Sequence, residues 1–134
     1  MQKAQAFTLI ELLVVIVIIG ILASIAYPNY KSYMLNVNRS DAINELQKAQ
    51  LVQSSLHILS TDYSTVIADV GLPSDHKYYT FTITSAGRNT YVMKAVAKKK
   101  TMQADDQAEC TTLVIDQDNA HYDGLGVDND KCWL

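Results

Sequence analysis

FTLIELLVVIVIIGILASIA, residues 7–26, is an apolar run of 20 residues with one charged side chain, Glu11. A helix of this length rises about 30 Å, which matches the hydrocarbon thickness of a bilayer. The run therefore predicts a membrane-spanning helix. A carboxylate near the start of such a helix costs up to about 3 kcal/mol unless it finds a partner, and anchoring alone does not require one. Either Glu11 reaches the headgroups from a slightly long interfacial segment, or it has a role outside the lipid.

The residues before the run form a short polar leader, Met1–Ala6 (MQKAQA), which carries Lys3. A secretory signal peptide places its apolar core before a small-residue cleavage site. Here the small residue, Ala6, precedes the apolar run. Cleavage between Ala6 and Phe7 would leave the hydrophobic helix on the mature protein, with Phe7 as its first residue.

This arrangement resembles the N-terminal segment of type IV prepilins, in which a short basic leader and a small residue precede F-T-L-x-E at the start of a hydrophobic helix. The motif reads A-F-T-L-I-E over residues 6–11 of this chain. Gly20 and Pro28 also coincide with a glycine and a proline of that family. The family usually has glycine immediately before the cut, where this chain has Ala6.

The resemblance implies roles for several positions of this segment. Prepilin peptidase would cut between Ala6 and Phe7 and methylate the new α-amine of Phe7. The Phe7 amine of one subunit would meet Glu11 of a neighbour when the helices stack with a stagger, a pairing that is strong at low dielectric. Gly20 and Pro28 would let the helix loosen as the subunit enters a filament, although membrane helices also tolerate both residues without such a role.

The rest of the chain has the size and charge of one small domain. About 105 residues follow Ala26, enough for one modest core, and the net charge of −3 argues against generic affinity for nucleic acid. In an exported chain the two cysteines, Cys110 and Cys132, predict a disulfide, which would close a loop of about 20 residues and contribute about 3 kcal/mol. Two unrelated thiols are the alternative. Without a C-x-x-C motif, we expect neither zinc nor redox chemistry.

Beyond Pro28 the pattern becomes that of an amphipathic helix, because apolar residues recur in steps of three and four. We expect one helix from Phe7 to His57, with its apolar side packed on a sheet and its polar side, which includes Arg39, facing solvent. The expected packing face consists of Tyr30, Met34, Val37, Ala42, Ile43, Leu46, Ala49 and Leu56.

Four segments predict strands, because they alternate and are rich in aromatic and β-branched residues. They are residues 78–84, 90–98 and 111–116, with a short fourth strand at 120–122. The first two flank the turn 85–89 and should form an antiparallel hairpin. Residues 58–76 are rich in turn formers and are expected to be irregular.

The layout resembles the type IVa pilin fold over the full length of the chain, and is most similar to the small minor pilins of the PilE type. The hairpin, the cysteine before TTLVID and the C-terminal pair Cys132–Trp133 carry this likeness, although Trp133 is also consistent with ordinary packing at a sheet edge. The resemblance implies an α+β fold, in which a long N-terminal helix packs on a three- to four-stranded antiparallel sheet. Its parts would be a leader, 1–6, a transmembrane and filament-core helix, 7–28, and a soluble head domain, 29–134.

The run Lys98–Lys100 after the second predicted strand has two interpretations. It predicts either a solvated turn or a contact with DNA. A DNA contact needs aromatic rings on which bases can stack, and only Tyr91 is close in sequence.

Other polar clusters do not indicate a chemical site. The acidic segments 116–118 and 123–130 lack the spacing of a calcium loop. His57, His76 and His121 share no ligand spacing, and no nucleophile motif is present. We therefore expect no catalytic residue, no metal, no cofactor and no enzymatic activity.

The combined pattern indicates a bacterial type IV pilus subunit, a minor pilin rather than the major one, which primes or enters a filament for twitching motility, adhesion and DNA uptake. The implied partners are other pilins, prepilin peptidase and the assembly platform of the inner membrane. The subunit would span the inner membrane once and later stand in the pilus at the cell surface. The alternatives are a pseudopilin of a type II secretion system, against which the C-terminal cysteine pair argues, and a DNA-receptor competence pilin.

Overall fold

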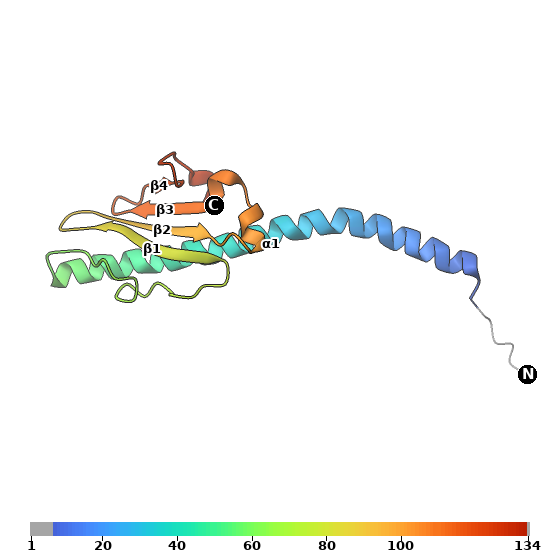
Figure 1. Ribbon diagram of the computed structural model, residues 1–134, viewed down its shortest axis with the longest axis horizontal. Helices are drawn as coiled ribbons and strands as arrows, with labels where there is room; N and C mark the ends of the chain where they lie inside the picture. The colour runs from blue at the N-terminus through green and yellow to red at the C-terminus, as the bar shows by residue number, and fades with distance from the viewer. Residues whose placement is uncertain (1–6, 134) are drawn as a thin grey trace, which may run out of the picture. The chain divides into compact units, whose positions relative to one another are not determined.

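The computed structural model describes residues 7–133. One helix, α1 (Leu9–Leu59, 51 residues), is followed by a four-stranded antiparallel sheet, so the predicted α+β fold is confirmed (Figure 1). The chain divides into two compact units, one ending at Met34 and one comprising Leu35–Leu134. The predicted boundary after Pro28 falls earlier in α1 than this division, and the predicted leader, with Ala6, lies outside the described residues.

The first unit contains the apolar part of α1. Within residues 7–133, α1 is the helix that is long and apolar enough to cross a membrane. Its apolar side chains are exposed along this part, as Leu9 (82%) and Leu22 (62%) illustrate. Such side chains prefer hydrocarbon to water, which agrees with the predicted membrane-spanning segment. Gly20 lies inside α1, and so does Pro28.

The second unit contains the sheet, whose strands follow one another in both chain and space. The strands are β1 (Tyr79–Ala86), β2 (Tyr91–Ala97), β3 (Thr112–Asp116) and β4 (His121–Tyr122). All three pairings are antiparallel. Each strand overlaps its predicted range, with ends that differ by at most two residues. In β2 every second side chain is buried, as the alternation of the sequence predicts.

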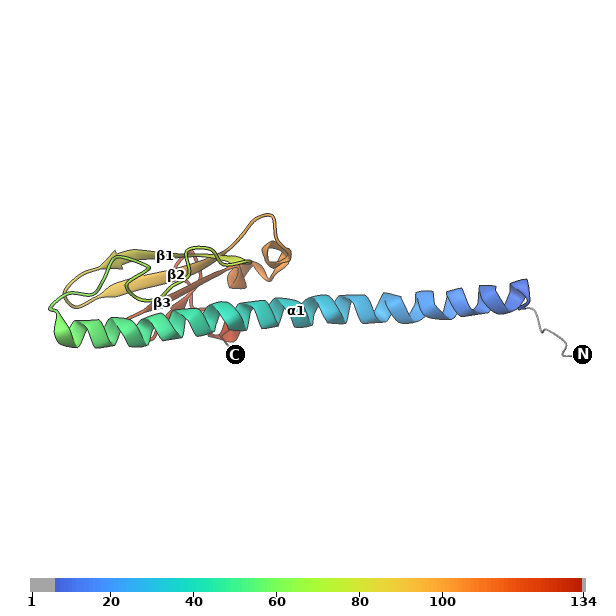
Figure 2. The ribbon, with the colours of Figure 1, turned by 90° about the horizontal axis from the view of Figure 1, so that it is seen from below.

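The core lies between one face of the sheet and the second part of α1, which runs alongside the strands in Figure 2. Ala42 and Leu46 of α1 are fully buried, as are Met93 of β2 and Ile115 of β3. Met93 and Ile115 are partners in the β2–β3 register. The spacing of four between the two helical residues places them on one side of α1, as predicted.

The buried face of α1 differs from the prediction at its N-terminal end. Tyr30 is 63% exposed and Val37 is 41% exposed, whereas Leu35, Asn38 and Arg39 are buried. The helical period correctly predicts the face from Ala42 onward. It fails before that point because a polar loop, rather than an apolar sheet, covers this part of the helix.

The long connection between α1 and β1 is irregular, as predicted, and a glutamine of α1 holds its first part. The side chain of Gln53 is fully buried. Its Nε2 donates to the Ser64 carbonyl at 2.8 Å, and its Oε1 accepts from the Ser64 N–H at 2.9 Å. The side-chain amide thus pairs with the loop backbone as another strand would.

Candidate functional site

Phe7 and Thr8 precede the first turn of α1, and Thr8 caps it. The Thr8 backbone N–H donates to Glu11 Oε2 at 2.9 Å, and the Thr8 hydroxyl donates to the same oxygen at 2.8 Å. The Glu11 N–H lies 3.3 Å from Thr8 Oγ1, which accepts from it. This reciprocal arrangement is a capping box. Sequence analysis missed this role of Glu11, although the signal, threonine followed three residues later by glutamate, is present in TLIE.

The capping box gives the carboxylate of Glu11 a partner inside its own subunit. The start of a helix favours an anion, because unpaired N–H groups and the helix dipole point there. Both hydrogen bonds that Thr8 donates to this carboxylate reach the same oxygen, Oε2. The side chain borders an open apolar hollow, which Phe7, Ile10, Val14 and Val15 also line. The carboxylate is therefore held in one orientation beside an exposed apolar surface.

The other predicted assembly residues lie along the exposed first part of the chain. Phe7 is 81% exposed and precedes α1. A Cβ built on Gly20 would meet nothing within 4 Å. Packing within the subunit therefore does not require glycine at this position.

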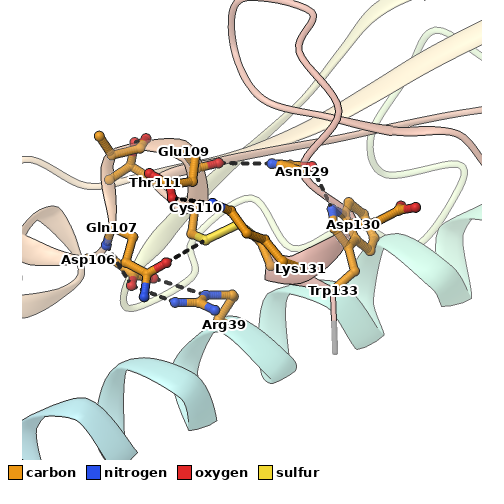
Figure 3. The surroundings of a disulfide bond; sticks show 12 residues. Arg39, Asp106, Gln107, Glu109, Cys110, Thr111, Asn129, Asp130, Lys131 and Trp133 are labelled. Atoms are coloured by element: carbon orange, nitrogen blue, oxygen red, sulfur yellow. Dashed lines mark hydrogen bonds and ion pairs between the residues drawn. A yellow bond between two sulfur atoms is a disulfide. The ribbon is translucent and has the colours of Figure 1, made fainter.

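The predicted disulfide is present in the second unit. Cys110 and Cys132 are bonded, with their Cα atoms 5.4 Å apart, and both are buried (Figure 3). Cys110 ends the 3-10 helix η2 (Ala108–Cys110), and Cys132 ends η3 (Asp130–Cys132). The bond encloses the segment that contains β3 and β4.

Hydrogen bonds fasten the same C-terminal segment independently of the sulfur atoms. Asn129 is 1% exposed, and its amide donates to the carbonyls of Glu109 (2.9 Å) and Thr112 (3.2 Å). The indole N–H of Trp133 donates to Asn129 Oδ1 at 3.1 Å, and the Trp133 ring stacks on His121 with centroids 4.0 Å apart. Trp133 therefore does more than pack at a sheet edge, because it orders the side chain that holds the loop.

An ion pair joins Lys131 to Glu109 across the ends of this segment. The Lys131 ammonium lies 2.6 Å from Glu109 Oε1. This hydrogen bond holds the pKa of the Glu109 carboxyl below its usual range. The two residues are neighbours in sequence of the two bonded cysteines, so the pair reinforces the same closure.

A buried ion pair joins α1 to the connection between β2 and β3. Arg39 Nε donates to Asp106 Oδ2 at 3.0 Å, and Nη2 to Oδ1 at 2.5 Å. Gln103, in the 3-10 helix η1 (Met102–Asp105), donates to Asp106 Oδ2 at 2.8 Å and to the Leu35 carbonyl at 3.2 Å. The expectation that Arg39 faces solvent is wrong, because it is 8% exposed. No local sequence pattern indicates a partner 67 residues away.

The lysine run begins next to an aromatic residue that is distant in sequence, Tyr78. The Lys98 N–H donates to the Tyr78 carbonyl at 2.8 Å, so the run begins next to the start of β1. Lys77 Nζ lies 4.9 Å from the centre of the Tyr78 ring. Lys77 is exposed, as are the last two lysines of the run Lys98–Lys100. The nearest aromatic in sequence, Tyr91, is 1% exposed and does not face this surface.

The acidic residues and histidines make structural contacts. Within residues 7–133, no group of three or more histidine, cysteine, aspartate or glutamate side chains is arranged to hold a metal ion. Oδ1 of Asp123 accepts the N–H groups of Leu125 and Val127 and so closes a turn. His76 Nδ1 accepts the N–H groups of Tyr78 and Tyr79.

Two protein-family models match the chain. One, described as "Prokaryotic N-terminal methylation motif", matches residues 1–27. The other, described as "Type IV minor pilin ComP, DNA uptake sequence receptor", matches residues 28–114. The first covers residues 1–6 and the apolar segment, and the second covers most of the core and of the sheet.

Relatives and one solved structure agree with these matches. The type IV wide pilus major component PilA4 of Thermus thermophilus is 37% identical over 98 residues, which are 71% of this chain and 75% of that protein. The type IV major pilin PilA of Myxococcus xanthus is 33% identical over 69% of this chain and 43% of its own length. The non-core minor pilin PilV of Neisseria meningitidis has the same fold, with a TM-score of 0.51 at 15% identity over 67% of this chain and 86% of PilV.

Proposed function

This chain belongs to the type IV pilin family, and from that premise we propose that it is a minor pilin, which primes or enters the pilus filament. The observation that carries the proposal is the exposed apolar segment that begins with Phe7 and the capped Glu11 and bears the N-terminal methylation motif. The match to a minor-pilin domain over residues 28–114 supports the assignment as a minor subunit. A pseudopilin of a secretion system is not better supported. Motility, adhesion and DNA uptake would be functions of the filament as a whole.

Maturation would prepare the pairing group. Prepilin peptidase would cut between Ala6 and Phe7 and methylate the amine of Phe7, which is 81% exposed and therefore accessible. In the inner membrane the mature subunit would then be delivered to the assembly platform. Gly20 and Pro28 would ease local loosening of α1 during assembly, because glycine and proline both weaken a helix.

The proposed contact between subunits uses the carboxylate that the capping box orients. Thr8 occupies Oε2 of Glu11. Within the described chain Oε1 receives no hydrogen bond from the capping residue, so it can accept an N–H of the Phe7 amine of a neighbour. A buried amine without an acceptor would be an unpaired charge, which is strongly unfavourable in a filament core. The capping box would thus present Glu11 to the next subunit without leaving its charge unsatisfied beforehand.

The proposal is tested by counting this subunit in sheared pili and in membranes by mass spectrometry. We expect a mature chain that begins with N-methylated Phe7 in both fractions, and far fewer copies than of the major pilin in the pili. A chain that is processed and abundant in membranes but absent from pili and from any pilus tip would contradict it. Copy numbers equal to those of the major pilin would reject only the minor-subunit assignment.

A second candidate function is direct binding of DNA. The matched domain is described as a DNA uptake sequence receptor. Lys77 and the start of the run Lys98–Lys100 both contact Tyr78, so these four lysines form one basic surface that can attract phosphate groups. A mobility-shift assay with residues 29–134 and a labelled duplex tests this function. Lys99→Gln/Lys100→Gln should weaken a genuine shift, and Lys48→Gln, on α1, should not.

A further inference from the structure

We propose that Lys77 and Lys98–Lys100, here called the basic surface, bind anionic phospholipid headgroups while the subunit is anchored in the membrane. The proposal rests on the membrane-anchored state and not on entry into a filament. It assigns a partner to a charged surface that the proposed contact between Phe7 and Glu11 does not use. The basic surface lies in the unit Leu35–Leu134.

The basic surface lies at the end of this unit that receives α1. The turn from Lys98 to Thr101 is closed by the Thr101 N–H and hydroxyl, which donate to the Lys98 carbonyl at 3.1 and 2.8 Å. The turn leads directly into η1, whose Gln103 binds the carbonyl of Leu35, the first residue of the unit. The turn is therefore fixed next to the residue at which α1 enters the head.

A second contact holds Lys77 at the same end. His76 Nε2 lies 3.0 Å from Asp41 Oδ2, so the segment before β1 is attached to α1 less than two turns after Leu35. The Lys98 N–H then joins the run to the carbonyl of Tyr78. All four lysines are thus gathered around the first turns of α1 in this unit.

The sequence of α1 sets the distance between this end and the lipid. The apolar run stops at Ala26, and the helix from there to Leu35 rises at most about 14 Å. Each interfacial layer of a bilayer is about 5–8 Å thick. Leu35 therefore follows the apolar run after nine residues, so the chain keeps the unit that carries the basic surface near a membrane in which the apolar run is anchored.

Exposed tyrosines independently mark the interface along α1. Tyr27, Tyr30 and Tyr33 are 71%, 63% and 66% exposed. Their spacing of three keeps them on neighbouring faces of the helix. Tyrosine concentrates at the headgroup level of membranes, so these rings place that level immediately before Leu35.

The charges on the basic surface favour an anionic partner. Its four lysines are accompanied by three carboxylates, of which Asp75 pairs with Lys98 at 3.2 Å and Asp41 pairs with His76. The third, Asp105, is exposed in η1. The surface is therefore positive, although the whole chain has a net charge of −3. Clustered lysines next to a membrane segment bind anionic lipid electrostatically. The basic surface lies beside the residue at which α1 enters this unit, and this position favours lipid over DNA as the partner.

Acetylation of lysines in the full mature chain tests the proposal. The chain is placed in nanodiscs of phosphatidylcholine alone, or of equal parts phosphatidylcholine and phosphatidylglycerol, and each labelled lysine is quantified by mass spectrometry. We expect anionic discs to reduce the acetylation of Lys99 and Lys100 several-fold, with recovery at high salt. Lys48 is the internal control. It lies about 20 Å further along α1 than Leu35, so it should react equally in both kinds of disc.

A matched pair of variants identifies the groups responsible. In anionic discs Lys99→Gln/Lys100→Gln should raise the acetylation of Lys77, and Lys48→Gln should leave it unchanged. Equal labelling in the two kinds of disc, or equal protection of Lys48, overturns the proposal. Protection by an added DNA duplex on neutral discs, without protection by anionic lipid, would also overturn it in favour of a nucleic-acid surface. No outcome depends on filament assembly, so failure here leaves the proposed pilin function untouched.

Discussion

Glu11 illustrates how one residue can serve two states of a subunit. In the isolated chain its Oε2 accepts two hydrogen bonds from Thr8, which satisfies both the carboxylate and the first turn of α1. Lipid anchoring alone would be easier with leucine at this position. The carboxylate is therefore best explained by the next contact that we propose for it, the Phe7 amine of a neighbouring subunit.

Replacement of Glu11 should separate insertion from assembly. Glu11→Leu should preserve leader cleavage and the membrane level but reduce the subunit's share of sheared pili by about tenfold or more, because the buried Phe7 amine loses its acceptor. Glu11→Gln is the matched control, since it keeps an acceptor for Thr8 and removes only the charge; it should be nearly as defective. Glu11→Asp should be intermediate. Normal incorporation of the glutamine variant would mean that helix packing alone carries assembly.

The buried pair Arg39–Asp106 should be the most sensitive polar contact of the head. Asp106→Ala leaves the Arg39 guanidinium buried without a partner and should lower the free energy of unfolding by about 3–5 kcal/mol. Replacing both residues, as Arg39→Met/Asp106→Leu, should cost clearly less. Urea unfolding of residues 29–134 measures both changes. Glu45→Gln, which breaks an exposed pair with Lys48 on the same helix, is the control and should have little effect. Equal losses in the single and double variants would contradict the account.

At the level of elements, the C-terminal segment is stable through its cross-links rather than through strand length. β4 has two residues and contributes little on its own. The segment is instead tied back at Cys110 by the disulfide and at Asn129 by two hydrogen bonds. The 3-10 helices η2 and η3 position the residues that make these contacts, because they place the cysteines and Asn129 next to the edge of β3.

The disulfide should be complete in the exported protein and should stabilise this segment. Thiol labelling of the unreduced, denatured head should find no free sulfhydryl. The double variant Cys110→Ala/Cys132→Ala should lose about 3 kcal/mol. Hydrogen exchange should rise in β4 and the residues after it, while β1 and β2 stay protected, because Asn129 holds the segment only in part. Quantitative labelling of both cysteines, or an equal rise in hydrogen exchange over the whole sheet, would contradict this prediction.

At the level of the whole molecule, the chain has two compact units, one with a surface suited to lipid and one with a surface suited to water. The unit ending at Met34 exposes apolar side chains along α1, whereas the unit Leu35–Leu134 buries them between α1 and the sheet. The second unit contains every residue of the hydrophobic core. Its stability should therefore not depend on the apolar segment.

Removal of the apolar segment should leave a folded, soluble head. A chain starting at Asn29 should be monomeric by light scattering and unfold cooperatively, because all core residues and the disulfide lie beyond its start. The mature chain from Phe7 is the control and should require detergent or lipid. Aggregation or a lack of structure in the shorter chain would show that the two-part organisation is wrong.

Sequence alone determined the features of this protein that depend on local periodicity and on solvent. Apolar residues without interruption predict a membrane helix, a period of two predicts strands, and an exported cysteine pair predicts a bond. The motif over residues 6–11 indicates the family, and even the capping box is readable from Thr8 and Glu11, since the two residues interact over one helical turn. Each of these signals lies within a short stretch of the chain or, for the cysteine pair, follows from composition alone.

Tertiary structure decided the contacts between segments far apart in the chain. Arg39 fits the polar face of an amphipathic helix, and only the approach of Asp106, 67 residues later, makes it a buried residue. Tyr78 and Lys98 likewise become neighbours only because β1 and β2 pair. The physical reason is that a helical or strand period records which face is apolar, but not which polar group will cover it, because that choice depends on how a loop closes over the finished core.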